Sequence, residues 1–219
     1  EMFLKLLRKK IVVDPKDIAN NIIDLLSQDP KFQALLEQSA LNCCHQFTTQ
    51  AVDVLTKREL FLEIIELCPI ADIKVEELLT SLRKALIFES YHFENVNTTQ
   101  FQLSLALHCF TNEYIYHETQ EERAKIQQIE EKIKKDLRNK KNPELFWLLC
   151  LASYRPLHAY PWCKNLENID GFEKVFKQQV ADYFEEEKII KNLRSIAPIT
   201  DKTSSAVSRQ YEENPYPRW

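Results

Sequence analysis

Apolar side chains recur along this chain at the three- and four-residue spacing of amphipathic helices, and no stretch alternates as a β-strand would. Polar segments that carry a capping side chain or a proline separate these helical stretches. Asp14-Pro15 and Asp29-Pro30, for example, each place a capping carboxylate before a proline, which fits the first position of a helix. The pattern therefore predicts an all-α fold, an irregular multi-helix bundle of about nine helices.

The predicted helices differ in how much of their surface is apolar, and this sets their expected place in the fold. The helix at 99–114 is apolar nearly all round, so we expect it to be central. The helix at 120–139 interleaves charges with isoleucines, so we expect one of its faces to lie in water. We expect the last long helix to bury four apolar side chains, Phe176, Val180, Phe184 and Ile190. The predicted helices cover residues 15–28, 30–41, 48–68, 72 or 74 to 88, 99–114, 120–139, 145–153, 172–194 and a short stretch after 203.

Glycine is nearly absent from the chain. Gly171 is the only glycine in 219 residues, where an average usage of ~7% would give roughly fifteen. Phosphate-binding loops and dinucleotide-binding folds need several glycines for tight turns and close backbone approach. We therefore do not expect this chain to hold a nucleotide-like cofactor in a glycine-rich loop.

Charge and hydropathy narrow the classes of partner. The formal net charge of −4 argues against a protein that coats nucleic acid. No apolar run approaches the ~20 residues that span a bilayer, and no signal peptide is visible. We expect neither nucleic acid nor membrane as a partner. Because Glu1 precedes Met2, we also expect the chain to be a segment of a longer protein.

The six cysteines do not look like a disulfide framework. Cys43 and Cys44 are adjacent, and Cys68, Cys109 and Cys150 lie in apolar surroundings, which is typical of buried free thiols. Together with the absence of a secretory signal, this favours a reduced, cytoplasmic location.

Candidate metal and catalytic groups do not form a convincing pattern. Cys43-Cys44-His45 and His108-Cys109 place metal-binding side chains next to each other, and neighbours on a helix point ~100° apart. We therefore predict no metal site. A cysteine nucleophile would need a histidine close to it in space, and the sequence does not indicate such a pair. We interpret Glu185-Glu186-Glu187 as a solvated run on a helix surface. No catalytic residue is assigned.

Residues 155–162 combine a guanidinium, an imidazole, two prolines and two aromatic rings. Two interpretations stay open: a structural loop packed on the last helices, or a contact surface for a substrate or a neighbouring domain. If it is a contact surface, the candidate interface residues are Arg155, His158, Tyr160 and Trp162.

The chain ends in a segment that cannot be helical throughout. Pro215 and Pro217 lack amide donors and push the residues before them to extended geometry. We therefore predict an extended, aromatic C-terminal strap. The expected organisation is a helical domain at 1–200, followed by a linker helix and strap at 201–219.

The strap Gln210-Tyr211-Glu212-Glu213-Asn214-Pro215-Tyr216-Pro217-Arg218-Trp219 resembles a signature segment of one bacterial family. These are class I S-adenosylmethionine-dependent methyltransferases with a helical region, often tetratricopeptide repeats, ahead of the catalytic domain. The helical middle region of rickettsial-type protein lysine methyltransferases is similar, more distantly. The resemblance covers roughly residues 15–219. It is supported upstream, in matching order, by Cys109-Phe110-Thr111-Asn112-Glu113-Tyr114, Tyr154-Arg155-Pro156-Leu157-His158 and Ala206-Val207-Ser208-Arg209.

The resemblance implies a role for the complete protein and a limit for this chain. In that family the strap leads into a Rossmann-like domain that binds S-adenosylmethionine, and this chain lacks the glycine-rich loop of such a domain. The implied partner is therefore a C-terminal methyltransferase domain in cis, and the chain alone is expected to be inactive and free of cofactor. The implied cofactor-binding residues are Tyr211, Asn214, Tyr216, Arg218 and Trp219.

Two functional hypotheses follow. In the first, the chain is the helical substrate-recognition or regulatory domain of a methyltransferase whose expected acceptor is a protein. In the second, it is a non-catalytic all-α protein-interaction module, in which the strap and residues 155–162 form the binding surface.

Overall fold

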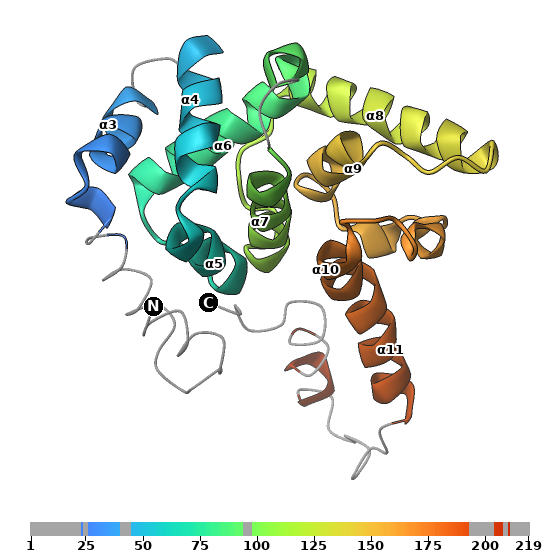
Figure 1. Ribbon diagram of the computed structural model, residues 1–219. Coiled ribbons are helices and arrows are strands. Elements are labelled where there is room, and N and C mark those ends of the chain that lie inside the picture. The colour runs from blue at the N-terminus through green and yellow to red at the C-terminus, as the bar shows by residue number, and fades with distance from the viewer. Residues whose placement is uncertain are drawn as a thin grey trace.

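The computed structural model describes residues 23, 26–39, 45–93, 98–192, 204–207 and 210. Within these residues every regular element is helical, so the all-α prediction is confirmed (Figure 1). The described part of the chain contains nine α-helices: α3 (Pro30–Ser39), α4 (His45–Thr56), α5 (Glu59–Leu67), α6 (Ile73–Phe88), α7 (Thr99–Thr111), α8 (Gln120–Arg138), α9 (Leu145–Ala152), α10 (Glu173–Phe176) and α11 (Asp182–Asn192).

Shorter turns join these helices. Three of them are 3₁₀ helices: η1 (Ser90–Phe93), η2 (Leu157–Ala159) and η3 (Cys163–Leu166). The fourth, η4 (Lys177–Ala181), is a π-helical turn that connects α10 directly to α11. In Figure 1, α3 to α6 lie on one side of α7, and α9 to α11 lie on the other.

Helix α7 lies at the centre of the bundle, as its apolar surface predicts. It packs against α5 on one side and α9 on the other, and also contacts α4 and α10. Phe101, Leu105 and Ala106 are fully buried along it. A helix that contacts neighbours on several sides needs apolar residues round most of its circumference, which is the pattern found here.

Helix α8 has the amphipathic character expected of it. The Thr119 hydroxyl accepts from the Glu122 amide, and the Glu122 carboxylate accepts from the Thr119 amide, which forms a capping box at its start. Ile126, Ile129 and Ile133 are buried against the rest of the fold. Most of the charged residues between them are exposed or half-buried, so the prediction of one wet face is confirmed.

The predicted helix at 48–68 is wrong in its extent and its continuity. The structure begins α4 at His45 and interrupts the helix after Thr56, so that α5 starts at Glu59. Arg58 leaves helical geometry at φ −106° and ψ 78°, and its guanidinium donates to the Val54 carbonyl and pairs with Asp29. A side chain that satisfies the end of α4 and also holds the start of α3 favours the break.

The predicted helix at 172–194 is also interrupted. The π turn η4 separates α10 from α11, and Val180 is buried in it while Phe176 and Phe184 are partly buried. Ile190, which we expected to be inside, is 66% exposed. The π turn inserts an extra residue, so the apolar face of α10 does not continue in register along α11.

Four cysteines in the described part of the chain are buried free thiols: Cys68, Cys109, Cys150 and Cys163. This confirms the prediction for the first three. Burial raises the pKa of Cys68 and of Cys109 to about 11, so both thiols stay protonated at neutral pH. None of the helices that the structure describes is long and apolar enough to cross a bilayer.

Several predicted features lie outside the described residues. They are most of the helix at 15–28, the Cys43-Cys44 pair and the strap at 211–219, which carries all five implied cofactor-binding residues. Residues 204–207 are helical, in agreement with the short helix expected there. The proposed boundary near residue 200 also falls outside the described residues and stays a prediction.

Candidate functional site

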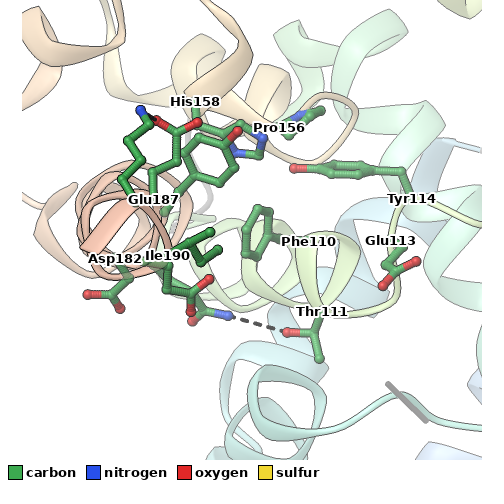
Figure 2. Close-up of a pocket in the computed structure, with 13 residues that line it drawn as sticks. Phe110, Thr111, Glu113, Tyr114, Pro156, His158, Asp182, Glu187 and Ile190 are labelled. Atoms are coloured by element: carbon green, nitrogen blue, oxygen red, sulfur yellow. Dashed lines mark hydrogen bonds and ion pairs between the residues drawn. The ribbon is translucent and has the colours of Figure 1, made fainter. Parts of the chain in front are cut away.

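A cavity of about 760 Å³ opens between the C-terminal end of α7, the segment that follows α9, and α11 (Figure 2). Its lining comes from residues far apart in the sequence, between 110 and 191. This volume lies within the ~300–1,000 Å³ that ligand sites usually occupy. The cavity is therefore a candidate binding site in the part of the chain that the structure describes.

One side of the cavity is aromatic. The rings of His158 and Tyr183 are stacked, with centroids 3.8 Å apart and planes within 10°. Phe110 meets His158 edge-on at 6.2 Å, and Tyr114 meets Phe110 edge-on at 6.4 Å. We call Phe110, Tyr114, His158 and Tyr183 the aromatic wall. Edge-to-face and stacked pairs of this kind are favourable and fix the ring orientations.

Carboxylates surround the opening. Glu113 comes from the turn after α7, and Asp182, Glu186 and Glu187 come from α11; we call these four residues the acidic rim. In Figure 2, Glu113 lies on the opposite side of Phe110 from Asp182 and Glu187. The rim therefore places negative charge on two sides of the cavity.

The acidic rim is only partly neutralised. Lys191, which also lines the cavity, pairs with Glu187 at 3.2 Å, and Lys177 pairs with Asp182 at 2.6 Å. Among the described residues, the side-chain carboxylates of Glu113 and Glu186 have no hydrogen-bond or ion-pair partner. Two carboxylates thus remain available to a ligand.

The turn after α7 holds one residue of the acidic rim and one residue of the aromatic wall in unusual backbone geometry. Glu113 and Tyr114 have φ values of 58° and 57°, in the left-handed region that L-residues seldom occupy. The Tyr114 amide donates to the Cys109 carbonyl at 2.8 Å, which closes the turn. Such strain persists only where the surroundings hold it, and it is concentrated at functional sites.

Gln179, on the π turn, joins the elements behind the cavity. Its buried amide nitrogen donates to the carbonyls of Ala106 on α7, at 3.0 Å, and Ala152 on α9, at 3.1 Å. Its amide oxygen lies 3.4 Å from both the Tyr114 hydroxyl and the Leu157 amide. One side chain therefore fixes α7, α9 and the segment after α9 against the start of α11. π turns often occur where function requires such irregular positioning.

The ring of His158 is oriented by the same turn. Its Nδ1 lies 3.2 Å from the Gln179 carbonyl, which can only accept a hydrogen bond. Nδ1 must therefore carry the proton, and in the neutral ring Nε2 is left as an acceptor. Stacking on Tyr183 and donation to a main-chain carbonyl hold the imidazole as part of the cavity wall.

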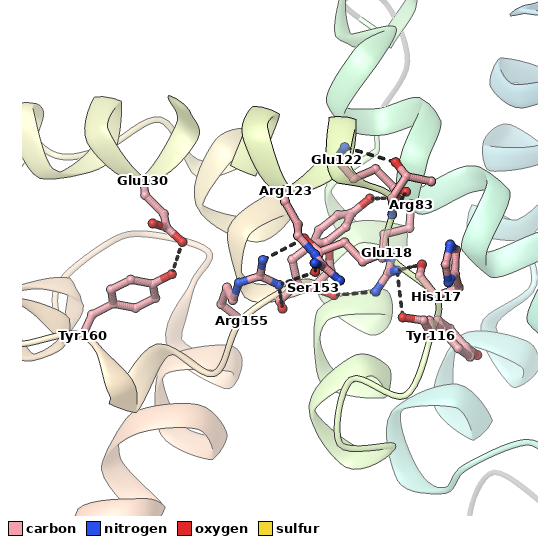
Figure 3. Close-up of polar contacts among 12 residues, drawn as sticks. Arg83, Tyr116, His117, Glu118, Glu122, Arg123, Glu130, Ser153, Arg155 and Tyr160 are labelled. Carbon is pink, nitrogen blue, oxygen red and sulfur yellow. Dashed lines mark hydrogen bonds and ion pairs between the residues drawn. The ribbon is translucent and has the colours of Figure 1, made fainter. Parts of the chain in front are cut away.

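Of the four predicted interface residues, the structure brings His158 to the cavity and places the other three elsewhere. Arg155 makes two hydrogen bonds to the Glu118 carboxylate, at 3.0 and 2.7 Å, and the Tyr160 hydroxyl donates to Glu130 on α8 (Figure 3). Trp162 stacks on Tyr160 with centroids 4.5 Å apart. These contacts attach the segment to α8 and to the turn before it. Whether Arg155, Tyr160 or Trp162 contacts a partner stays a prediction.

A buried cation supports the base of this segment. Arg83 on α6 is 2% exposed, and its guanidinium lies 4.1 Å from the Tyr154 ring centroid. It donates to the carbonyls of His117, at 2.8 Å, and Ser153, at 3.4 Å (Figure 3). The Tyr154 hydroxyl in turn donates to Glu122 at 2.7 Å. Arg83 thereby ties α6 to the start of the segment that carries His158.

Sequence reasoning missed most of the cavity. Glu185 and Glu186 are exposed and Glu187 is half-buried, in agreement with the interpretation as a solvated run, but the sequence did not indicate that Glu186 and Glu187 also line a cavity. A signal was available: Tyr183, Glu186, Glu187 and Ile190 follow one face of a helix at spacings of three, four and seven. Nothing in the sequence indicated that this face would meet the end of α7.

In the part of the chain that the structure describes, no three metal-binding side chains gather as ligands would. Comparison of the chain with protein-family models, with curated proteins and with solved structures gives no match.

Proposed function

We propose that this chain is the helical substrate-recognition domain of an S-adenosylmethionine-dependent protein methyltransferase. One observation carries the proposal. Two of the segments that carry the family resemblance, 109–114 and 154–158, are forty residues apart in the chain and meet at the cavity. Phe110, Glu113 and Tyr114 of the first segment line it together with Pro156 and His158 of the second.

The cavity's contribution to methyl transfer would be positioning. A methyl group moves from sulfonium to acceptor by direct displacement, which requires in-line alignment of the reacting atoms. A domain that holds the acceptor protein can supply that alignment without touching the cofactor. The residues around the cavity are held by Gln179 and Arg83, and such rigidity suits a positioning role.

The cofactor belongs to a further domain in this proposal. S-adenosylmethionine would bind a Rossmann-like domain that follows the strap, and Tyr211, Asn214, Tyr216, Arg218 and Trp219 would lie against that domain. The complete protein would act in the cytoplasm. The buried free thiols support this location, because cytoplasmic cysteines are normally reduced.

A non-catalytic interaction module is the second candidate, and the position of the cavity favours it. The described residues that line the cavity all lie between 110 and 191, within the proposed helical domain. Binding there requires no second domain. The two candidates agree on the cavity and differ on whether a methyl group is transferred.

Calorimetry on a longer protein that continues past Trp219 separates them. If the proposal is correct, the longer protein binds S-adenosylmethionine with a micromolar dissociation constant, while the 219-residue chain binds none. Incubation with radiolabelled S-adenosylmethionine then labels protein acceptors. If the longer protein shows no heat of cofactor binding and transfers no label, the methyltransferase proposal fails and the interaction module is favoured.

A further inference from the structure

We propose that the cavity binds a cationic side chain, arginine or lysine, presented by a basic segment of a partner protein. This inference deepens the recognition role proposed above, because it names the chemistry of what is recognised. It rests on the cavity being a binding site, and it does not depend on methyl transfer.

The first argument is charge complementarity. The acidic rim contributes four carboxylates, and among the described residues that line the cavity Lys191 is the only lysine or arginine. Lys191 is already paired with Glu187, whereas the side-chain carboxylates of Glu113 and Glu186 have no partner among the described residues. An anionic ligand would face net repulsion there, while a cation would gain two charge-assisted hydrogen-bond acceptors.

The second argument is the aromatic wall. A cation beside aromatic rings is attracted by the negative charge of the ring faces, and arginine can also stack flat on them. The stacked pair of His158 and Tyr183, with Phe110 edge-on to it, gives the cavity a broad aromatic surface. A neutral polar ligand would gain less from such a wall, and a purely apolar ligand would leave the carboxylates unused.

The third argument is the exposed aliphatic surface beside the rim. Ile190 lines the cavity and is 66% exposed, so its side chain offers apolar surface to a ligand. Arginine and lysine carry long methylene stems below the charged group, and these stems cover apolar surface while the head reaches a carboxylate. One side chain of this type would satisfy Ile190, the aromatic wall and the acidic rim together.

The test uses the 219-residue chain and fluorescein-labelled peptides of one length in fluorescence anisotropy. The parent peptide is Gly-Ser-Arg-Arg-Ser-Gly, and matched peptides replace both arginines with lysine, citrulline or glutamate. We expect the arginine and lysine peptides to bind, and the citrulline peptide to bind about tenfold more weakly because it keeps the shape without the charge. The ratio between arginine and lysine identifies the preferred cation.

The variants are chosen in matched pairs on α11. Glu186→Gln should weaken binding of the arginine peptide by about fivefold, because it removes an unpaired rim carboxylate. Glu185→Gln makes the same chemical change one residue away, outside the cavity, and should leave binding unchanged. Tyr183→Ala should weaken binding by about tenfold, and Tyr183→Phe should retain it, since the ring and not the hydroxyl is used. Thermal melts check that each variant folds.

The proposal is overturned if the citrulline and arginine peptides bind equally, or if Glu185→Gln weakens binding as much as Glu186→Gln. The second result would indicate unspecific attraction to an acidic protein. Failure here leaves cofactor binding by the longer protein unaffected, and failure of cofactor binding leaves this test intact. The two proposals can therefore fail independently.

Discussion

His108, in the last turn of α7, is fully buried, and both of its ring nitrogens have partners. Nδ1 lies 2.8 Å from the Ile65 carbonyl, and Nε2 lies 2.7 Å from the Tyr116 hydroxyl. The carbonyl accepts only, so Nδ1 carries the proton and Nε2 accepts from the tyrosine. Burial raises the pKa of Tyr116, so the hydroxyl stays protonated and keeps donating. The sequence placed His108 in an apolar helix, but its partners on other elements could not be predicted from it.

Because the imidazole of His108 is buried, we predict that the folded state loses stability in mild acid. Burial lowers the pKa of His108 to about 4, because the charged ring would lose its hydration. In the unfolded chain the pKa is ~6.5, so between these values the unfolded state binds a proton that the folded state does not. The stabilising contribution is complete above pH ~6.5 and is lost as the pH falls towards 4, by about 2.5 kcal/mol at pH ~4.5.

Urea unfolding at neutral pH and at pH ~4.5 measures this effect. His108→Gln should be less stable than the wild type at neutral pH. Its free energy of unfolding should, however, fall less between neutral pH and pH ~4.5, by about 2 kcal/mol. His117→Gln, at an exposed histidine, should show the wild-type drop and serves as the control. An unchanged drop in His108→Gln would mean that another group controls the acid sensitivity.

At the scale of elements, local capping signals were predictable and contacts between distant segments were not. Asp72 accepts from the Lys74 and Val75 amides at the start of α6, and Thr119 begins α8, because a capping side chain acts within its own turn. The break before α5 depends on Arg58 reaching Asp29, and the π turn depends on Gln179 reaching α7 and α9. Both contacts require a fold that periodicity alone does not specify.

Because Gln179 links several elements from the π turn, we predict that it stabilises the fold far more than its neighbour Gln178. Gln179→Ala leaves the Ala106 carbonyl without its side-chain donor and removes the link to Ala152 and Leu157, so we expect a loss of about 2–3 kcal/mol in the free energy of unfolding. Gln178→Ala removes a single hydrogen bond of 3.3 Å to Thr111 at a half-buried position and should cost less than about 1 kcal/mol. Urea unfolding of both variants measures these losses. Similar losses in the free energy of unfolding would show that Gln179 is not the link between these helices.

At the scale of the whole molecule, the bundle brings together three segments that the sequence keeps apart. The aromatic wall comes from α7, the turn after it, the segment after α9 and α11, and the acidic rim comes from two of these. The all-α class and the central place of α7 follow from hydrophobic periodicity. The cavity does not follow from periodicity, because it depends on how the π turn directs α11 and on the strained turn at Glu113 and Tyr114.

The central claim is that this cavity recognises a protein acceptor, and the most direct measurement is steady-state methylation kinetics of Tyr183→Ala in the longer protein. We predict that KM for the acceptor rises by about tenfold while the dissociation constant of S-adenosylmethionine is unchanged, because Tyr183 lines the cavity and, in the proposed function, its ring would contact the acceptor and not the cofactor. Tyr183→Phe should restore the wild-type KM. An unchanged KM for the acceptor, or a parallel loss of cofactor affinity, would contradict the account.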